Sequence, residues 1–186
     1  LKVIDQSHES VTSNITTIEM RRDLRLATSE TAEYAIDFGN QFHIKSMNGF
    51  NIRSSAFRVL NINTDVYLFD VPSSDRERGQ IGLFSLNSGT STPVIQRRNV
   101  GVINYKTGRI TLDPINIVSG KTKDSVQILE ISAAPESNDI IGLQDLYLQL
   151  DSSTVDMVVD PISSGSDPSG SNYTVTTSYS NGNIIR

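Results

Sequence analysis

The sequence has no cysteine, no tryptophan and only two histidines among its 186 residues. Without cysteine it offers no disulfide bond, no thiol nucleophile and no cysteine-ligated zinc site. Two imidazoles leave little room for a histidine-rich metal site. These absences remove several classes of chemistry at once. We therefore expect a chain that is not an enzyme and that carries no catalytic residue, no metal site and no cofactor.

Positive charge and long apolar runs are also scarce. Lys and Arg number 16 against 21 Asp and Glu, which gives a net charge of −5. Because a nucleic-acid interface needs positive charge to neutralise phosphates, we expect no nucleic-acid partner. The longest apolar run, residues 66–69, is far shorter than the ~20 residues that span a bilayer, so we expect no membrane insertion. The chain starts at Leu1 without a signal-peptide pattern, which predicts a fragment of a longer protein.

The sequence is rich in β-branched and small polar residues. Ile, Val and Thr number 49, against 19 Ala and Leu, and Ser, Thr and Asn together number 54. Branching at Cβ restricts the side chain against a helical turn but packs well on a pleated sheet. The composition therefore predicts a mainly β fold, built of antiparallel sheets and hairpins with little helix.

Alternation of apolar and polar residues predicts strands along most of the chain. Residues 18–26 alternate with Arg22 as the one break, which favours a strand and leaves a helix as the alternative. Residues 139–150 fit a short helix and a strand equally well. Further strands are predicted at 32–38, 42–45, 55–60, 65–71, 80–86, 116–119, 125–132, 155–159 and 173–177, and loops at 73–79, 87–92 and 162–172.

The clearest local signal is a hairpin over residues 100–112. Two strands rich in β-formers flank the turn at residues 105–108. Gly108 can adopt the positive φ that a type I turn followed by a bulge requires. We expect Asp113-Pro114 to end the second strand, because proline cannot donate to a sheet ladder.

Residues 133–139 contain Pro135 and suggest a connection between two parts. The predicted organisation is a β-rich domain over residues 1–134 and a C-terminal β segment over 135–186, which holds a Ser/Gly-rich loop and forms an interface. A single domain is the alternative.

Charge is distributed unevenly along the chain. Residues 1–110 carry a net charge of +2 and residues 111–186 a net charge of −7, and ten of the eleven arginines lie in the first part. A drift in composition over an ordinary solvated surface is one interpretation. The other is a pair of complementary surfaces, since arginine is favoured at protein interfaces. The last strand has little apolar content and is suited to pairing with a sheet edge, including that of a partner. The candidate interface residues are Arg97, Arg98, Tyr173, Val175 and Tyr179.

Motifs with a catalytic or ion-binding meaning are weak. Ser119–Thr122 imitates the end of a phosphate-binding loop, but Ile115 occupies the place of the first glycine, so we expect a surface turn. Four aspartates between 151 and 167 could collect calcium through nearby loops, yet they lack the dense spacing of a calcium loop. Paired aspartates of a hydrolase are a further hypothesis.

Three stretches carry a resemblance to a known family. The hairpin segment 101–112 with residues 115–117, the stretch 145–150 with 155–160, and the closing residues 179–186 resemble baseplate wedge proteins of contractile-tailed, T-even-type bacteriophages. The similarity is to the C-terminal part of the large wedge subunit of the inner ring. Residues 1–31 match no such stretch.

The resemblance implies a structural virion protein without catalytic residues. Such a wedge protein associates with itself, joins neighbouring wedges into a ring around the hub, contacts other wedge proteins and takes part in the rearrangement that triggers sheath contraction. The expected location is the tail baseplate, after assembly in the host cytoplasm, where a chain without cysteine is well suited to reducing conditions.

A function of another class is a receptor- or carbohydrate-binding β domain of a fibre or adhesin. This alternative requires exposed aromatic side chains gathered around one pocket. The chain has few aromatic residues for such a pocket, namely six Phe, six Tyr and no Trp.

Overall fold

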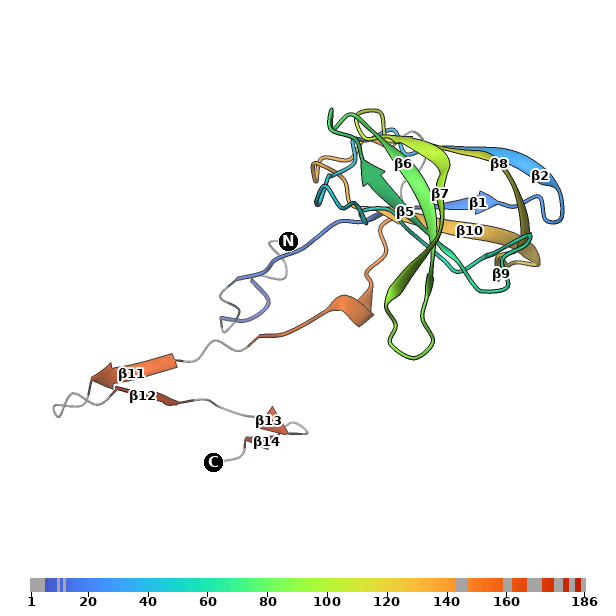
Figure 1. The fold of residues 1–186 in the computed structure, drawn as a ribbon. Helices are drawn as coiled ribbons and strands as arrows, with labels where there is room; N and C mark the ends of the chain where they lie inside the picture. The colour runs from blue at the N-terminus through green and yellow to red at the C-terminus, as the bar shows by residue number, and fades with distance from the viewer. Residues whose placement is uncertain are drawn as a thin grey trace. The chain divides into compact units, whose positions relative to one another are not determined.

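The computed structural model describes residues 6–9, 11, 13–142 and 147–158, and the backbone of four further strands between residues 162 and 184. The described chain is built of antiparallel strands (Figure 1), which confirms the predicted mainly β fold with little helix. Among the described residues the one helical element is a single 3-10 turn, Ser152–Thr154.

Two sheets make up the first part of the chain. The larger sheet has, in spatial order, β2 (Thr31–Asp37), β8 (Arg109–Ser119), β7 (Pro93–Asn104), β6 (Arg78–Leu86) and β5 (Tyr67–Pro72), with β4 (Arg58–Val59) also paired to β8. The smaller sheet has β1 (Met20–Arg25), β10 (Val126–Ala133) and β3 (Arg53–Ser54), with β9 (Lys121–Lys123) also paired to β10. Buried side chains of both sheets meet in one hydrophobic core.

Strand β8 shows how the apolar pattern builds this core. Ile110 and Leu112 are buried on one side of the strand, and Ile115 and Ile117 continue the buried row after a shift by one residue. The shift falls where the register of β8 against β2 also changes, which marks a β-bulge. The expectation that Asp113-Pro114 ends the strand is therefore wrong, because the bulge accommodates a proline within a continuous strand.

The hairpin predicted over residues 100–112 is confirmed. Strands β7 and β8 pair directly across residues 101–104 and 109–112. Gly108 has a φ of +70°, and its amide donates to the carbonyl of Asn104 at 3.0 Å. A side chain at Gly108 would also overlap the backbone of Asn40, so the position requires glycine for both reasons.

The first half of β7 is a strand that the sequence pattern did not predict. Residues 93–97 pair with β6, and the tip of the β6–β7 hairpin, past Phe84 and Ile95, extends beyond β5 and β8 (Figure 1). The register between β6 and β7 changes twice between Gly101 and Ile95, and Asn99 has a φ of +57°. Bulges of this kind increase the twist of a hairpin, which turns its tip away from the sheet.

Four other expectations are corrected. Phe42 forms only an isolated bridge to Pro135, so 42–45 is not a strand. Segment 55–60 contributes only short β4. Within the predicted loop 162–172 lies β11 (Ile162–Ser166), because it pairs with β12 (Asn172–Val175). The described part of 139–150 contains no helix.

The chain divides into two compact units, Leu1–Asp145 and Leu146–Arg186. Residues 135–141 belong to the first unit and hydrogen-bond to its residues 40–41: the amide of Glu136 donates to the carbonyl of Gln41 at 2.9 Å, and the side chain of Asn40 bonds both backbone groups of Ile141. The second unit contains β11, β12, β13 (Tyr179–Ser180) and β14 (Asn183–Ile184). The boundary predicted after residue 134 stays a prediction.

Candidate interaction surfaces

Four aromatic side chains from three segments gather at one edge of the larger sheet. Tyr67 on β5 lies directly opposite Phe84 on β6, and their rings stack with centroids 5.4 Å apart. Phe50, from the preceding loop, stacks on Phe69 at 5.2 Å and meets the edge of Phe84 at 5.8 Å. The ring of Phe69 lies over Gly82, where a side chain would overlap it. Sequence reasoning missed this cluster, although two aromatics two residues apart on one strand were a signal for it.

The aromatic rings form one side of a groove of about 310 Å³ between β3 and β5. The residues that line it, called here the aromatic groove, are Lys45, Phe50, Ile52, Arg53, Ser54, Tyr67, Leu68 and Phe84. Lys45 and Arg53 are exposed and have no ion pair among the described residues. No carboxyl group lines the groove. Its chemistry therefore suits a ligand with an apolar surface and negative charge.

A buried aspartate holds the loop that forms the far wall of the groove. Asp70 is 1% exposed, and its two carboxyl oxygens accept hydrogen bonds from the Tyr105 hydroxyl and the Ile52 amide, both at 2.7 Å. Its backbone carbonyl accepts from the Phe50 amide at 3.3 Å. Gly49 approaches this carbonyl so closely, with a φ of +81°, that no side chain fits there. These contacts fix Phe50 and Ile52 beside β5.

An exposed apolar face continues from the groove onto the β6–β7 hairpin. Ile95 lies directly opposite Phe84, and Leu86 lies opposite Pro93, so both pairs stand on the face that carries Tyr67. Ile95 and Leu86 are exposed. The hairpin thus lengthens the apolar surface of the groove.

The predicted interface residues lie in both units. Arg97 and Arg98 are exposed on β7, outside the part of the strand that pairs with β8, and Arg97 lies opposite Leu83 of β6. Tyr173 and Val175 belong to β12, and Tyr179 belongs to β13, where it pairs with Ile184. The structure thus does not bring the five together in one described site. Their role in an interface stays a prediction.

A second, polar cleft of about 330 Å³ lies on the other side of Tyr105. In it the Nδ1 atom of His43 lies 2.9 Å from Glu136, and the Nζ atom of Lys106 lies 3.7 Å from Glu77. Its charged groups are thus largely paired with one another. The lining includes no serine, threonine or cysteine, and the hydroxyl of Tyr105 already donates to Asp70.

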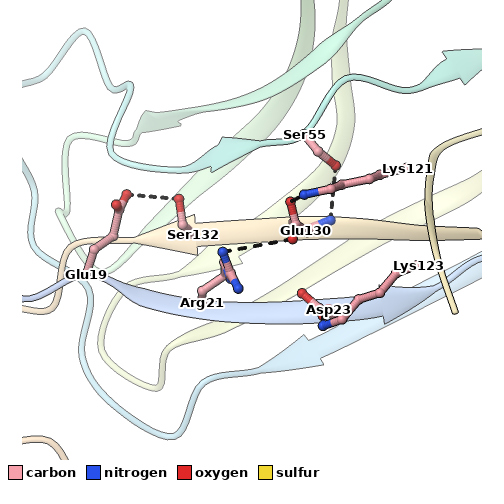
Figure 2. A network of polar contacts seen from close by, with 8 residues as sticks. All are labelled: Glu19, Arg21, Asp23, Ser55, Lys121, Lys123, Glu130 and Ser132. Atoms are coloured by element: carbon pink, nitrogen blue, oxygen red, sulfur yellow. Dashed lines mark hydrogen bonds and ion pairs between the residues drawn. The ribbon is translucent and has the colours of Figure 1, made fainter. Parts of the chain in front are cut away.

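Charges on the smaller sheet are paired within the molecule (Figure 2). Glu130 on β10 is 3.9 Å from Arg21 on β1 and accepts a hydrogen bond from Lys121 on β9 at 2.6 Å. Asp23 on β1 accepts one from Lys123 on β9 at 2.5 Å, and this bond raises the pKa of the lysine. These pairs place charge along the edge strand β1, a feature that discourages edge-to-edge pairing. These ion pairs are internal to the fold. Lys45 and Arg53 of the groove are therefore better candidates for binding an acidic partner.

Residues 147–158, called here the extension, carry large apolar side chains that are exposed. Leu148 is 97% exposed, Tyr147 90% and Met157 89%, and Leu150, Val155 and Val158 are exposed as well. The 3-10 turn, capped by the Asp151 side chain, separates two apolar pieces, 147–150 and 155–158. Exposed apolar side chains in such a row are typical of surfaces that bind another molecule.

The described residues hold no group of three or more His, Asp or Glu side chains suited to a metal ion. Among the same residues, no helix has the length and apolar character to cross a membrane. Comparisons with protein-family models, curated proteins and solved structures found no match. The groove and the extension are the candidate functional surfaces of the described residues.

We predict that Tyr105→Phe lowers the free energy of unfolding by about 1–3 kcal/mol at neutral pH, because it leaves a buried carboxyl oxygen of Asp70 without its donor. Urea unfolding followed by circular dichroism measures the change. Tyr67→Phe, in the groove and away from Asp70, is the matched control. Equal losses in the two variants would contradict the anchoring role.

The pH dependence provides a second test. Burial, and then the hydrogen bond and charge of Asp70, raise the pKa of Tyr105 above its ordinary value of 10.0. The folded chain therefore keeps this proton at pH values where the unfolded chain has released it. We predict that stability is fully present below about pH 10 and falls above it, by up to about 1.4 kcal/mol per pH unit, and that Tyr105→Phe shows a shallower fall. Parallel curves for parent and variant would refute this.

Proposed function

We propose that this chain is a non-enzymatic structural module of the tail baseplate of a contractile-tailed bacteriophage. It associates with further copies of itself and with other wedge proteins, joins neighbouring wedges into a ring around the hub, and takes part in the rearrangement that triggers sheath contraction. Its location is the virion, after assembly in the host cytoplasm. It acts through the surfaces that it presents to its neighbours.

The observation that carries this proposal is the extension. Six large apolar side chains are exposed within twelve residues, Tyr147 to Val158. Fully burying one such side chain stabilises an interface by about 1.5–3 kcal/mol. Burial of only part of this row by a partner therefore releases enough free energy to offset the conformational entropy that the segment loses when it is ordered. An assembly module has this property, whereas a module that works alone leaves the row in water.

Two further features support the same function. The resemblance to baseplate wedge proteins includes residues 145–150 and 155–160, which overlap the extension. The exposed Arg97 and Arg98 lie on the part of β7 that does not pair with β8, where a neighbouring chain can reach them.

Sedimentation velocity over a wide range of protein and salt concentrations tests self-association. We predict reversible oligomers of the parent chain, and at least about tenfold weaker association for the double variant Leu148→Ser and Met157→Ser, because two apolar side chains are lost from the interface.

The matched control is the double variant Val102→Ser and Val118→Ser, which removes two exposed apolar side chains from β7 and β8. It should associate like the parent. A parent chain that stays monomeric at every concentration and binds no other baseplate protein would overturn the proposal.

A receptor-binding role is the second candidate, and the aromatic groove is the observation that favours it. Stacked rings beside Lys45 and Arg53 suit a sugar with a carboxylate or sulfate group better than a neutral sugar. A glycan array tests this role: binding to acidic glycans that is lost in Phe50→Ala would support it. Equal signals from parent and variant, or no signal, would dismiss it.

A further inference from the structure

We propose that the extension of one copy of this chain docks in the aromatic groove of a second copy. This inference rests on the proposed function, in that it takes the chain to associate with itself. It goes further by naming the two surfaces that meet. The sides of the contact are residues 147–158 on one copy and the groove between β3 and β5 on the other.

The groove is a preformed receptor for such a segment. The backbone edge of β5 is already occupied there, because the Leu68 amide donates to the Ser54 hydroxyl at 2.9 Å and the Asp70 carbonyl accepts from Phe50. Recognition therefore uses side chains: aromatic faces for apolar groups, and Lys45 and Arg53 for carboxylates. The hydrogen bonds of Asp70 hold the loop in place before any partner arrives.

The extension has the complementary composition. It carries Asp151 and Asp156, and no Lys or Arg occurs anywhere between residues 124 and 185. Its two apolar pieces stand on either side of the 3-10 turn. The exposed apolar surface of the larger sheet is also in two parts, the groove and its continuation through Ile95 and Leu86. Opposite charge and matching apolar surface favour this receptor over the polar cleft, where His43 and Lys106 already face carboxylates of their own chain.

A second copy is the occupant because the same chain exposes both surfaces. Leu148 and Met157 on the extension are exposed, and so is Phe50 on the groove. The net charge is +2 before residue 111 and −7 after it. These opposite charges also favour contact between the first part of one copy and the last part of another. When two copies exchange extensions, each groove and each extension is filled, and the contact closes on itself.

A charge-exchange experiment on the full chain tests the contact. The groove variant carries Lys45→Glu and Arg53→Glu, and the extension variant carries Gln149→Lys and Asp156→Lys. Asp151 is kept because its carboxyl oxygen accepts the hydrogen bond that caps the 3-10 turn. A control with Arg25→Glu and Arg109→Glu makes the same change in net charge away from the groove.

We expect each charge variant alone to associate at least about tenfold more weakly than the parent, and the control to associate like the parent. An equal mixture of groove and extension variants should regain parental affinity to within about threefold, since every contact in the mixed dimer again joins opposite charges. Sedimentation velocity measures the parent, the two charge variants, the control and the mixture, and circular dichroism verifies that each variant is folded.

The outcomes separate this inference from the proposed function. Two results would overturn the docking contact and leave the assembly function standing. In the first, the parent chain associates and the groove variant has the same affinity. In the second, the mixture does not regain the affinity of the parent. A parent chain that is monomeric throughout overturns both, including the case in which the extension fills the groove of its own copy.

Discussion

The buried carboxyl group of Asp70 is the contact on which the surfaces of this molecule depend. It joins three segments: β5, where it resides; the loop through Ile52, whose amide donates to it; and the β7–β8 turn, from which Tyr105 donates its hydroxyl. A polar group buried this deeply is stable only when hydrogen-bonded, so the three segments must come together in one arrangement. That arrangement sets Phe50 against Phe69 and opens the aromatic groove at the edge of the sheet. The groove is thus a consequence of satisfying one buried carboxyl group.

Many of the other charged side chains form ion pairs within the chain, whereas those of the groove do not. On the smaller sheet, Glu130 and Asp23 take up Lys121, Lys123 and Arg21, and in the polar cleft His43 and Lys106 face carboxylates of their own chain. The cations of the groove have no such partners among the described residues. Net charge alone did not reveal this difference, because it treats paired and unpaired groups alike. In a chain that is acidic on average, the fold thus produces a groove lined by two cations and an extension that carries only acidic charged groups.

The sequence predicted what depends on local pattern. The β-branched composition indicated sheets, and the glycine of the 105–108 turn indicated the hairpin, because a single positive φ sufficed. The pattern also held an unused signal, since the buried row of β8 shifts by one residue at Asp113-Pro114, as a bulge requires. The first half of β7 was missed because two bulges, one around Asn99 and one between Ile95 and Arg97, interrupt its alternation. The groove could not be predicted from the sequence. Phe50, Tyr67 and Phe84 come together only through the register of β5 against β6 and through the hydrogen bonds of Asp70.

The most direct test of the central claim uses the three methionines of the chain. Met157 in the extension is 89% exposed in a single copy, whereas Met20 is in the core at 8%. Peroxide oxidation, quantified by mass spectrometry at rising protein concentration, measures whether the extension is covered when copies meet. The account predicts that Met157 oxidises rapidly in dilute solution and progressively more slowly as concentration rises, while Met20 stays slow throughout. Oxidation of Met157 at one unchanged rate across all concentrations would contradict it.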